Sequence, residues 1–336
     1  MGRVARPRVV ITFVTNEAHA LADDLRVLEN GAGWLPLAGG SLVRVSGKGH
    51  REALQRVLSQ DVLGLRHGEG GLALLLAPKG QFRAMMAVFA GVEESFLLAP
   101  PGCGAELSRA LNTYLRLSRC NSEPVTSTGE IAVLGACFRE AVDGAGAAAL
   151  PKGGWVEVPG VLWFGRTLFG VPGAVAVAHD AEALAVLHAA LGAAGARPLS
   201  EEAVELTRIR AGWPAWGAEL TETVLPPEAG IEAETISYSK GCYVGQETVA
   251  RMKTYGHPTR GLVGLRQLAG SVEKPALPVP LSALGEEKSR GTLTSWGLHP
   301  EHGGVGLALV RRELTQPGTR LAGDNREFEV TSSPLW

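Results

Sequence analysis

The sequence predicts an α+β protein that ends in a separate all-β unit. In residues 41–134 the predicted order is strand, helix, strands, helix, strand. This order favours helices packed on mostly antiparallel sheets over a doubly wound parallel sheet. A second set of strands and helices follows in residues 138–209. Beyond residue 258, short apolar runs separated by Gly and Pro turns are typical of a small β-barrel or sandwich.

Elements of the first set are predicted from hydrophobic periodicity and from the Gly and Pro residues that end each segment. Leu21, Leu25 and Leu28 recur at helical spacing. Residues 72–77 form a short apolar run between a glycine and a proline, which indicates a buried strand. The predicted helices are residues 18–29, 51–58 and 106–116, and the predicted strands are residues 41–46, 72–77, 81–90, 95–99 and 130–134.

The second set carries two helix start signals. Asp180 and Ser200 each precede a helical run and are predicted N-caps. A further predicted helix contains Gly144 and Gly146, which weaken it. The predicted helices are residues 138–150, 181–191 and 201–209, and the predicted strands are residues 156–158, 161–164 and 174–178.

The carboxyl-terminal part is predicted to be entirely β. Proline-rich residues 272–281 are not expected to form a central strand, because proline cannot donate to a strand ladder. The predicted strands are residues 262–265, 291–295, 306–310 and 328–330.

Composition limits the function classes. The 336 residues suffice for two or three domains, and a formal net charge of −2 gives no attraction to nucleic acid or to an anionic membrane. No apolar run reaches membrane-spanning length. Residues 1–8 are basic, but the apolar run that follows is too short for a secretory signal. We expect a cytoplasmic protein that contacts neither membrane nor nucleic acid directly.

The cysteines give no sign of a metal site. None belongs to a Cys-x-x-Cys motif or to a His/Cys cluster with zinc or iron–sulfur spacing. A disulfide framework is not expected at this size, which fits a reducing compartment. The four cysteines are Cys103, Cys120, Cys137 and Cys242. The sequence therefore predicts no bound metal.

Residues 240–247, Lys-Gly-Cys-Tyr-Val-Gly-Gln-Glu, gather more reactive groups than any other short stretch. A helix is predicted over residues 248–255, so Cys242 lies just before its positive end, with Lys240 nearby in sequence. Both features favour the thiolate form. The segment predicts a reactive-thiol loop, and a Gly-rich turn with an incidental cysteine is the alternative.

This loop also resembles the signature of the YgfZ-type folate-binding proteins, which are relatives of the glycine cleavage aminomethyltransferase, or T-protein. Residues 208–217 resemble the Arg-x-Glu-Ala-Gly-x-x-x-x-Gly run of the same superfamily. Residues 225–228 and 236–238 fill the interval as the YgfZ branch does. The resemblance is dense over residues 208–260 and looser over residues 41–135.

The resemblance implies three domains in a ring around a tetrahydrofolate-binding channel. Two ferredoxin-like units would occupy residues 1–260, and a β-barrel residues 261–336. It implies a folate-binding accessory protein for iron–sulfur cluster assembly or repair, which supports enzymes such as tRNA-modifying ones. Its partners would be iron–sulfur client or assembly proteins. The alternative is a tetrahydrofolate-dependent aminomethyl or one-carbon transferase, or a demethylase, so enzymatic activity stays open.

The expected site residues fall near the two motifs. Cys242 and Lys240 are the expected reactive residues. The expected tetrahydrofolate contacts are Arg208, Tyr243, Gln246, Glu247 and Arg251. The cations Arg208, Arg210, Lys240, Arg251, Lys253 and Arg260 would form a cleft for the folate glutamate tail, or only a solvated basic face. Glu247 suits the pterin edge, but equally the first turn of a helix.

Some features depart from the family pattern. The chain lacks the Asp-Phe-Ile-Gly-type run of the aminomethyltransferases, and residues 163–171 offer no acid for a pterin. Tryptophans associated with folate in some YgfZ proteins align near Gly40 and Val204, neither of which is aromatic. The tryptophans that could take their place are Trp34, Trp213 and Trp216.

Overall fold

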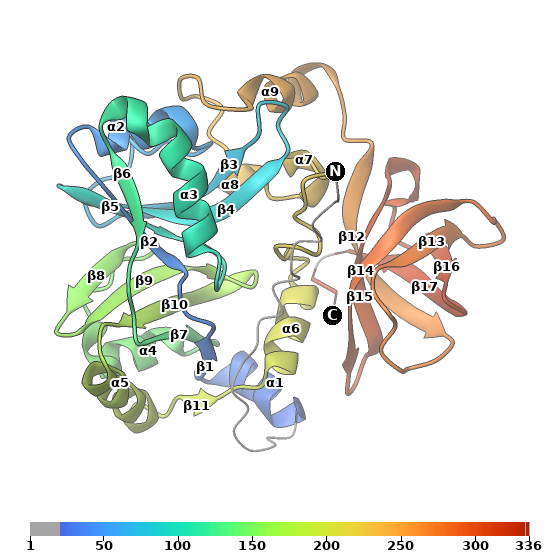
Figure 1. The fold of residues 1–336 in the computed structure, drawn as a ribbon. Coiled ribbons are helices and arrows are strands. Elements are labelled where there is room, and N and C mark those ends of the chain that lie inside the picture. Colours follow the sequence, from blue (N-terminus) through green and yellow to red (C-terminus); the bar gives the residue numbers. More distant parts are fainter. Residues whose placement is uncertain (1–20, 333, 336) are drawn as a thin grey trace, which may run out of the picture.

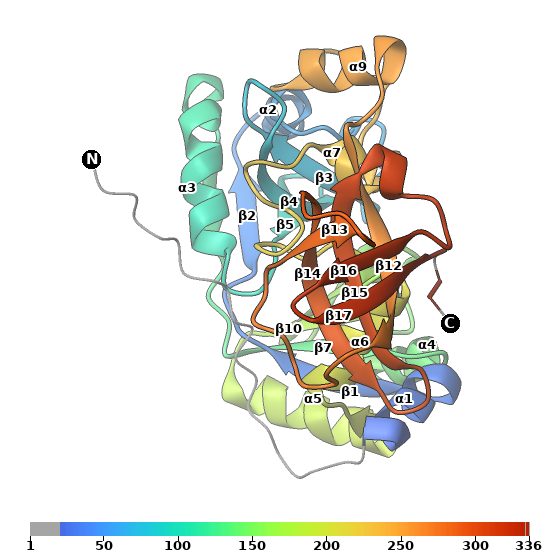
Figure 2. The same cartoon turned by 90° about the vertical axis from the view of Figure 1, so that its right-hand side faces the viewer.

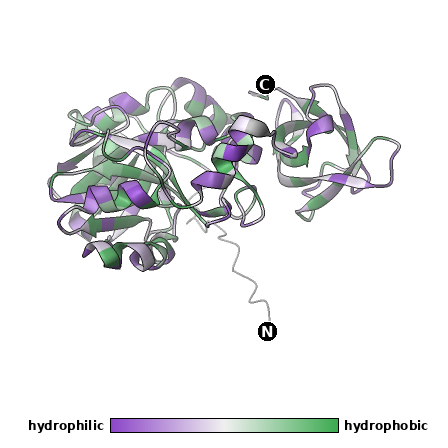
Figure 3. Ribbon diagram, turned by 90° about the horizontal axis from the view of Figure 1, so that it is seen from above, coloured by the Kyte–Doolittle hydropathy of each residue, from purple (hydrophilic) through white to green (hydrophobic). Residues whose placement is uncertain are grey.

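The computed structural model describes residues 21–332, 334 and 335 and folds them into two stacked sheets and a closed β-barrel (Figure 1). Seen from above, the barrel stands apart from the two-sheet part, with a helix between them (Figure 3). The predicted fold class, two ferredoxin-like units and a carboxyl-terminal barrel, is confirmed. The basic segment at residues 1–8 and the apolar run after it lie outside the described residues.

The first domain is a five-stranded antiparallel sheet in the order β3-β4-β5-β2-β6. Helices α2 (His50–Val57) and α3 (Gly104–Leu115) cover its outer face, where Leu54, Leu107 and Leu111 are buried. The strands are β2 (Leu42–Ser46), β3 (Gly70–Leu76), β4 (Phe82–Ala90), β5 (Glu94–Leu98) and β6 (Asn121–Pro124).

The second domain is a six-stranded sheet in the order β11-β1-β7-β10-β9-β8. Its strand β1 (Gly33–Leu37) precedes the whole first domain in sequence, yet it pairs antiparallel with β7 and parallel with β11. The first domain is therefore inserted between two strands of the second. The other strands are β7 (Gly129–Leu134), β8 (Trp155–Val158), β9 (Val161–Leu168), β10 (Val171–Ala178) and β11 (Arg197–Pro198).

The inner faces of the two sheets pack against each other. The Phe164 ring of β9 lies 4.9 Å from the Phe89 ring and 5.8 Å from the Phe96 ring, measured between centroids. On the outer face of the second sheet lie α4 (Phe138–Val142) and α5 (Ala181–Ala193), whose Leu187 and Leu191 are buried. The result is a four-layer arrangement of helices, sheet, sheet and helices.

Helix α6 (Glu201–Arg210) links the two-sheet part to the barrel. Ser200 caps it as predicted, with its hydroxyl accepting from the Ala203 N–H at 3.4 Å. Leu206 and Ile209 pack on Val305 and Leu307 of the barrel. Helix α1 (Leu21–Asn30) lies across α6 at the lower end of the molecule in Figure 1. After α6 come α7 (Pro226–Ala229), α8 (Glu232–Thr235) and α9 (Gln246–Tyr255).

The barrel closes in the order β12-β15-β14-β13-β16-β17 and faces the viewer in Figure 2. Its own core holds Leu265, Leu293 and Phe328. The strands are β12 (Arg260–Ala269), β13 (Val279–Ala283), β14 (Ser289–His299), β15 (Gly303–Arg311), β16 (Arg320–Gly323) and β17 (Arg326–Thr331).

Two sequence predictions were wrong in part. The helix over residues 138–150 ends at Val142 and passes into a π-type turn, Asp143–Ala147, in which Gly146 has φ 88°. Such a left-handed backbone suits glycine and stops the helix. The expectation of no central strand in residues 272–281 fails for the last three, which begin β13.

Proline is tolerated in these strands because a neighbouring strand has ended. Pro280 pairs with Thr292 of β14, whereas β16 pairs with β13 only through Ser282 and Ala283. Pro36 of β1 likewise lies beyond the two residues that pair with β11. Each proline therefore lacks a ladder neighbour on one side, the position that proline requires in a sheet.

Candidate functional site

Residues 240–247 form a loop that leads into α9 and lies against the first domain. Lys240 anchors its start. The Lys240 ammonium is buried and donates to the carbonyl oxygens of Gln55, Leu58 and Gln60 at 2.6, 2.6 and 2.9 Å. These carbonyls belong to the last turn of α2 and the segment after it. Desolvation lowers the pKa of Lys240 to about 8.

Tyr243 and Gln246 anchor the end of the loop. The Tyr243 side chain is buried against Leu74, Leu76 and other apolar residues of the first sheet, and burial raises its pKa to about 12. Its backbone N–H donates to Oε1 of Gln246 at 3.3 Å. Gly245 has φ 82°, and a Cβ there would lie 2.5 Å from the Ala77 carbonyl oxygen. Glycine at this position therefore lets the loop approach the first domain closely.

Cys242 lies between these two anchors and is exposed. Cys103 and Cys120 are buried, and desolvation raises the pKa of both thiols. Cys137 is half-buried. The fixed backbone on either side of Cys242 presents its thiol to solvent, a few residues before the first turn of the ten-residue helix α9.

Glu247 and Arg251 lie one turn apart on α9 and pair with each other at 2.7 Å, with both side chains largely exposed. The predicted site residues Lys240, Cys242, Tyr243, Gln246, Glu247 and Arg251 thus form one loop-and-helix unit. This unit lies at the upper edge of the molecule in Figure 1.

Arg208 lies elsewhere, in a buried network on α6. Its guanidinium pairs with Glu205 at 2.6 Å and with the fully buried Glu219 at 3.3 Å, and it donates to Ser295 Oγ of the barrel at 2.6 Å. Desolvation opposes its charge, but the two carboxylates outweigh it and raise the pKa of Arg208. Nη1 also donates to the carbonyl oxygen of Trp213 at 2.6 Å.

The predicted cationic cleft is therefore not one open surface. Arg208 is buried among carboxylates, and Lys240 is satisfied by carbonyls. Arg260 pairs with Glu228 at 2.8 Å, and the Lys253 ammonium lies 3.5 Å from the centre of the Tyr238 ring. Arg210 pairs with Glu29 at 3.1 Å.

Sequence reasoning missed Arg166, a β9 residue on the face that packs toward the first domain. Its Nη1 donates to the Leu98 carbonyl and its Nε to the Thr167 carbonyl, both at 3.2 Å. Desolvation lowers the pKa of Arg166 to about 10. The strand predicted from the sequence ends at residue 164, whereas β9 runs to Leu168, so Arg166 lay outside the prediction; its only signal was its spacing of two residues from Phe164.

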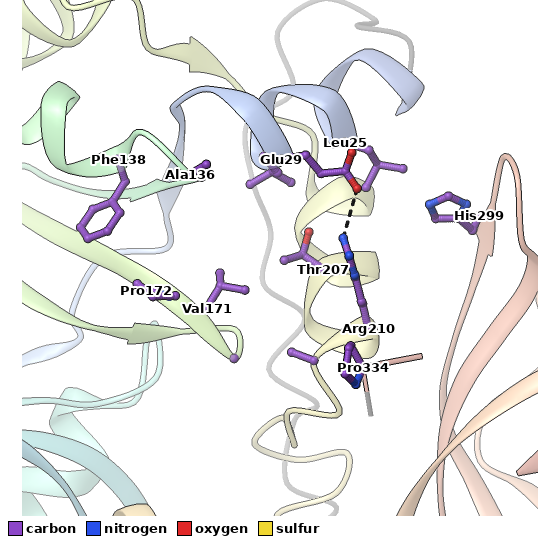
Figure 4. Close-up of a pocket in the computed structure, with 14 residues that line it drawn as sticks. Leu25, Glu29, Ala136, Phe138, Val171, Pro172, Thr207, Arg210, His299 and Pro334 are labelled. Atoms are coloured by element: carbon purple, nitrogen blue, oxygen red, sulfur yellow. Dashed lines mark hydrogen bonds and ion pairs between the residues drawn. The ribbon is translucent and has the colours of Figure 1, made fainter. Parts of the chain in front are cut away.

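Two cavities lie near the domain junctions. The larger, of about 600 Å³, is bounded by α1, α6, the β9–β10 turn and the barrel (Figure 4). Phe138, Val171 and Pro172 line one side, and the Glu29–Arg210 pair and His299 line the other. The smaller, of about 280 Å³, lies between α3, the end of β5 and the segment after α6; its lining includes Arg83, Pro100, Cys103 and Trp216.

The described residues bring no three His, Cys, Asp or Glu side chains into an arrangement that could hold a metal ion. Among the helices in the same residues, none is long and apolar enough to span a bilayer.

Known proteins resemble the chain in both sequence and fold. No protein-family model matches it. The aminomethyltransferase of Geobacillus kaustophilus (strain HTA426) is 27% identical over 299 residues, which cover 84% of this chain and 80% of that protein. The tRNA-modifying protein YgfZ of Serratia proteamaculans (strain 568) is 43% identical over 89 residues, 26% of this chain and 27% of that protein.

The same architecture occurs in the crystal structure of glycine cleavage system aminomethyltransferase T from Bartonella henselae. The TM-score is 0.84 at 19% identity, and the match covers 94% of this chain and 89% of that chain. The protein therefore has a T-protein-like fold. Since its relatives carry both names, aminomethyltransferase and YgfZ, the predicted resemblance to the YgfZ and T-protein superfamily is confirmed.

Proposed function

We propose that the protein binds tetrahydrofolate and assists iron–sulfur cluster assembly or repair in the cytoplasm, with Cys242 as its working thiol. The observation that carries the proposal is the fixed loop, which exposes Cys242 between the buried anchors Lys240 and Tyr243. A thiolate is the sulfur ligand that iron and iron–sulfur clusters take from proteins. The partners are iron–sulfur client or assembly proteins, including tRNA-modifying enzymes.

The other loop residues act by holding the thiol in place. Lys240 fixes the loop to the end of α2, and Tyr243 and Gln246 fix its other end. Glu247 and Arg251, both exposed on α9, are available to a folate or a partner at the loop. Arg208 does not contact the ligand in this proposal. It positions Trp213, whose backbone carbonyl accepts a hydrogen bond from Arg208.

A folate fits the chemistry of the domain junction better than that of the loop. Folate combines a flat aromatic ring system with a tail of carboxylates. Trp216 lines the smaller cavity, and Trp213 packs between the apolar cluster that joins the two sheets and the cluster beneath the loop. Aromatic walls with a few polar groups are typical of sites for such ligands.

The thiol role is tested by complementation of a deletion strain, with the activity of an iron–sulfur tRNA-modifying enzyme as the readout. We expect the Cys242→Ala variant to restore only a small part of the enzyme activity that the wild type restores. Cys137→Ala changes a half-buried thiol outside the loop and is the matched control. Equal restoration by Cys242→Ala and the wild type would remove the thiol from the proposal.

The second candidate is a tetrahydrofolate-dependent aminomethyl or one-carbon transferase, or a demethylase. The near full-length match to aminomethyltransferases favours it. It is tested by incubating the protein with tetrahydrofolate and several methylamine donors. Turnover that survives Cys242→Ala would support this candidate, and no turnover with any donor would count against it.

A further inference from the structure

Two helices present similar faces to the larger cavity. Each contributes three residues at a spacing of i, i+3 and i+4, which places the three side chains on one face of a helix. The two charged members, Glu29 and Arg210, pair at 3.1 Å, and Figure 4 shows them side by side. The residues are Leu25, Leu28 and Glu29 of α1, and Thr207, Arg210 and Ala211 at the end of α6.

The opposite wall of this cavity is apolar. Phe138, Val171 and Pro172 form it (Figure 4). Gly170 has φ 82°, and a Cβ there would lie 2.4 Å from the Ala211 Cβ, so glycine lets the β9–β10 turn close against α6. The volume of about 600 Å³ falls within the range of roughly 300–1,000 Å³ for small-molecule sites, and the smaller cavity, at about 280 Å³, does not reach it.

The carboxylate of Glu29 contributes little to the fold. It lies in the last turn of α1, where the partial negative charge of the helix end opposes an anion. Its pair with Arg210 is also accessible, because the Glu29 side chain is 52% exposed and the Arg210 side chain 38%. Ion pairs at such exposure add little stability. Among the described residues that line the cavity, Glu29 is the one carboxylate.

We propose that the larger cavity binds a fused bicyclic ring with a 2-aminopyrimidin-4-one edge, the chemistry that pterins and guanine share. This edge carries two N–H donors, on the exocyclic amine and the adjacent ring nitrogen, followed by a carbonyl acceptor. A carboxylate accepts from both N–H groups, and a guanidinium donates to the carbonyl. Glu29 and Arg210 lie next to each other and offer these groups in the matching order.

The apolar residues of the two walls would cover the faces of the bound ring. Leu25 and Leu28 lie on the α1 side, and Val171 and Pro172 lie on the side of the β9–β10 turn. A flat ring between apolar walls, oriented by a few polar groups, is the usual form of such a site. A pterin would make this cavity the ring site of the proposed folate binding, whereas a guanine would make it independent of that function.

The test measures three ligands by calorimetry: 6-methyltetrahydropterin, tetrahydrofolate and guanosine. We expect Glu29→Gln to weaken the binding of each ligand that the wild type binds by roughly 10- to 100-fold, the value of hydrogen bonds to a charged group. Glu222→Gln is the matched control, with an effect below about twofold. Glu222 pairs with Arg83 at 3.1 Å and is 54% exposed, but it is not among the residues that line the cavity.

A second readout separates a ligand role from a structural one. Both variants remove one carboxylate from a half-exposed pair, so each should change the melting temperature of the ligand-free protein by no more than about 3 °C. A much larger fall in Glu29→Gln than in Glu222→Gln would show that the carboxylate serves the fold, and would overturn the proposal. Equal losses of affinity in the two variants would overturn it as well.

The three ligands also separate this site from the proposed function. Binding of guanosine alone, lost in Glu29→Gln, would support the site and count against folate binding. Tetrahydrofolate binding that Glu29→Gln leaves unchanged would keep the proposed function and overturn the site. No binding of any of the three ligands to the wild type would overturn the site together with the folate part of the proposed function.

Discussion

Arg208 is buried and Arg166 half-buried where domains meet, and their partners differ. Arg208 joins α6, the segment after it and the barrel through two carboxylates and a serine. Arg166 of the second sheet donates to the Leu98 carbonyl of the first sheet and to the Thr167 carbonyl of its own strand, and no described carboxylate pairs with it. Removing one partner of a buried ion pair destabilises a fold strongly, whereas an arginine held only by carbonyl oxygens leaves no buried carboxylate unpaired when it is removed. Burial alone therefore does not reveal the role of a cation.

The largest effect should follow from breaking the Arg208 network. Arg208→Leu leaves the fully buried Glu219 without its cation, which should lower the free energy of unfolding by about 3–5 kcal/mol. Urea unfolding followed by tryptophan fluorescence measures it. Arg166→Leu in the same assay should cost nothing or stabilise the protein. Similar losses for the two variants would abolish the distinction between the two arginines.

Removing the anchor of the thiol loop should have the next largest effect. Lys240→Met leaves three carbonyl oxygens without their donor, so we expect a loss of about 2–4 kcal/mol and faster amide exchange in residues 240–247. Lys253→Met is the control, because Lys253 lies over the Tyr238 ring and holds no carbonyl. Unchanged exchange in the loop would contradict the anchoring role.

The Arg260–Glu228 pair predicts an acid-sensitive joint between α7 and the barrel. Burial raises the pKa of Glu228, but hydrogen bonds from Arg260 and the Leu225 N–H outweigh it, so the net pKa is lowered. The stabilisation is present above the ordinary carboxyl value of 4.5 and is lost as pH falls through the lowered value. Glu228→Gln should lower the free energy of unfolding by about 1–2 kcal/mol at neutral pH. It should also make the free energy of unfolding fall less steeply as pH is lowered below 4.5. Urea unfolding between about pH 3 and pH 7 measures it, and a fall in stability with pH as steep as that of the wild type would refute the role of this pair.

The smallest effect should be at the exposed pair on α9. Glu247 and Arg251 are mostly exposed, and a double-mutant cycle should give a coupling of only about 0.3–0.5 kcal/mol. A loss of tetrahydrofolate affinity or of complementation in Glu247→Ala without such a stability change would show that the pair serves a ligand or partner. A coupling above about 1.5 kcal/mol would show instead a structural pair.

Most helices and strands were predicted from the sequence because each contains a local signal, such as a cap or an apolar run. The caps at Asp180 and Ser200 and the apolar run of β3 required no knowledge of the tertiary fold. The signals failed where a neighbour decides the outcome. Pro36 and Pro280 are in strands because the adjacent strand is short, which no local pattern reports.

The candidate site shows the same limit. The loop at residues 240–247 was predicted from contiguous residues, and the structure places its anchors as one unit. Which acids pair with Arg208, and that no described acid pairs with Arg166, depends on which segments the fold brings together. A list of cations within fifty residues could not distinguish a paired arginine from an open one.

The insertion of the first domain between β1 and β7 has a consequence for how the chain can be assembled. Residues 42–124 hold a complete sheet, whereas the second sheet needs residues 33–37 together with residues as distant as Pro198. During synthesis all strands of the first sheet emerge before the second sheet can form. Strand β1 stays unpaired until β7 and then β11 have been synthesised. The second sheet therefore forms after the first, and in a chain cut after the first domain β1 has no strand with which to pair.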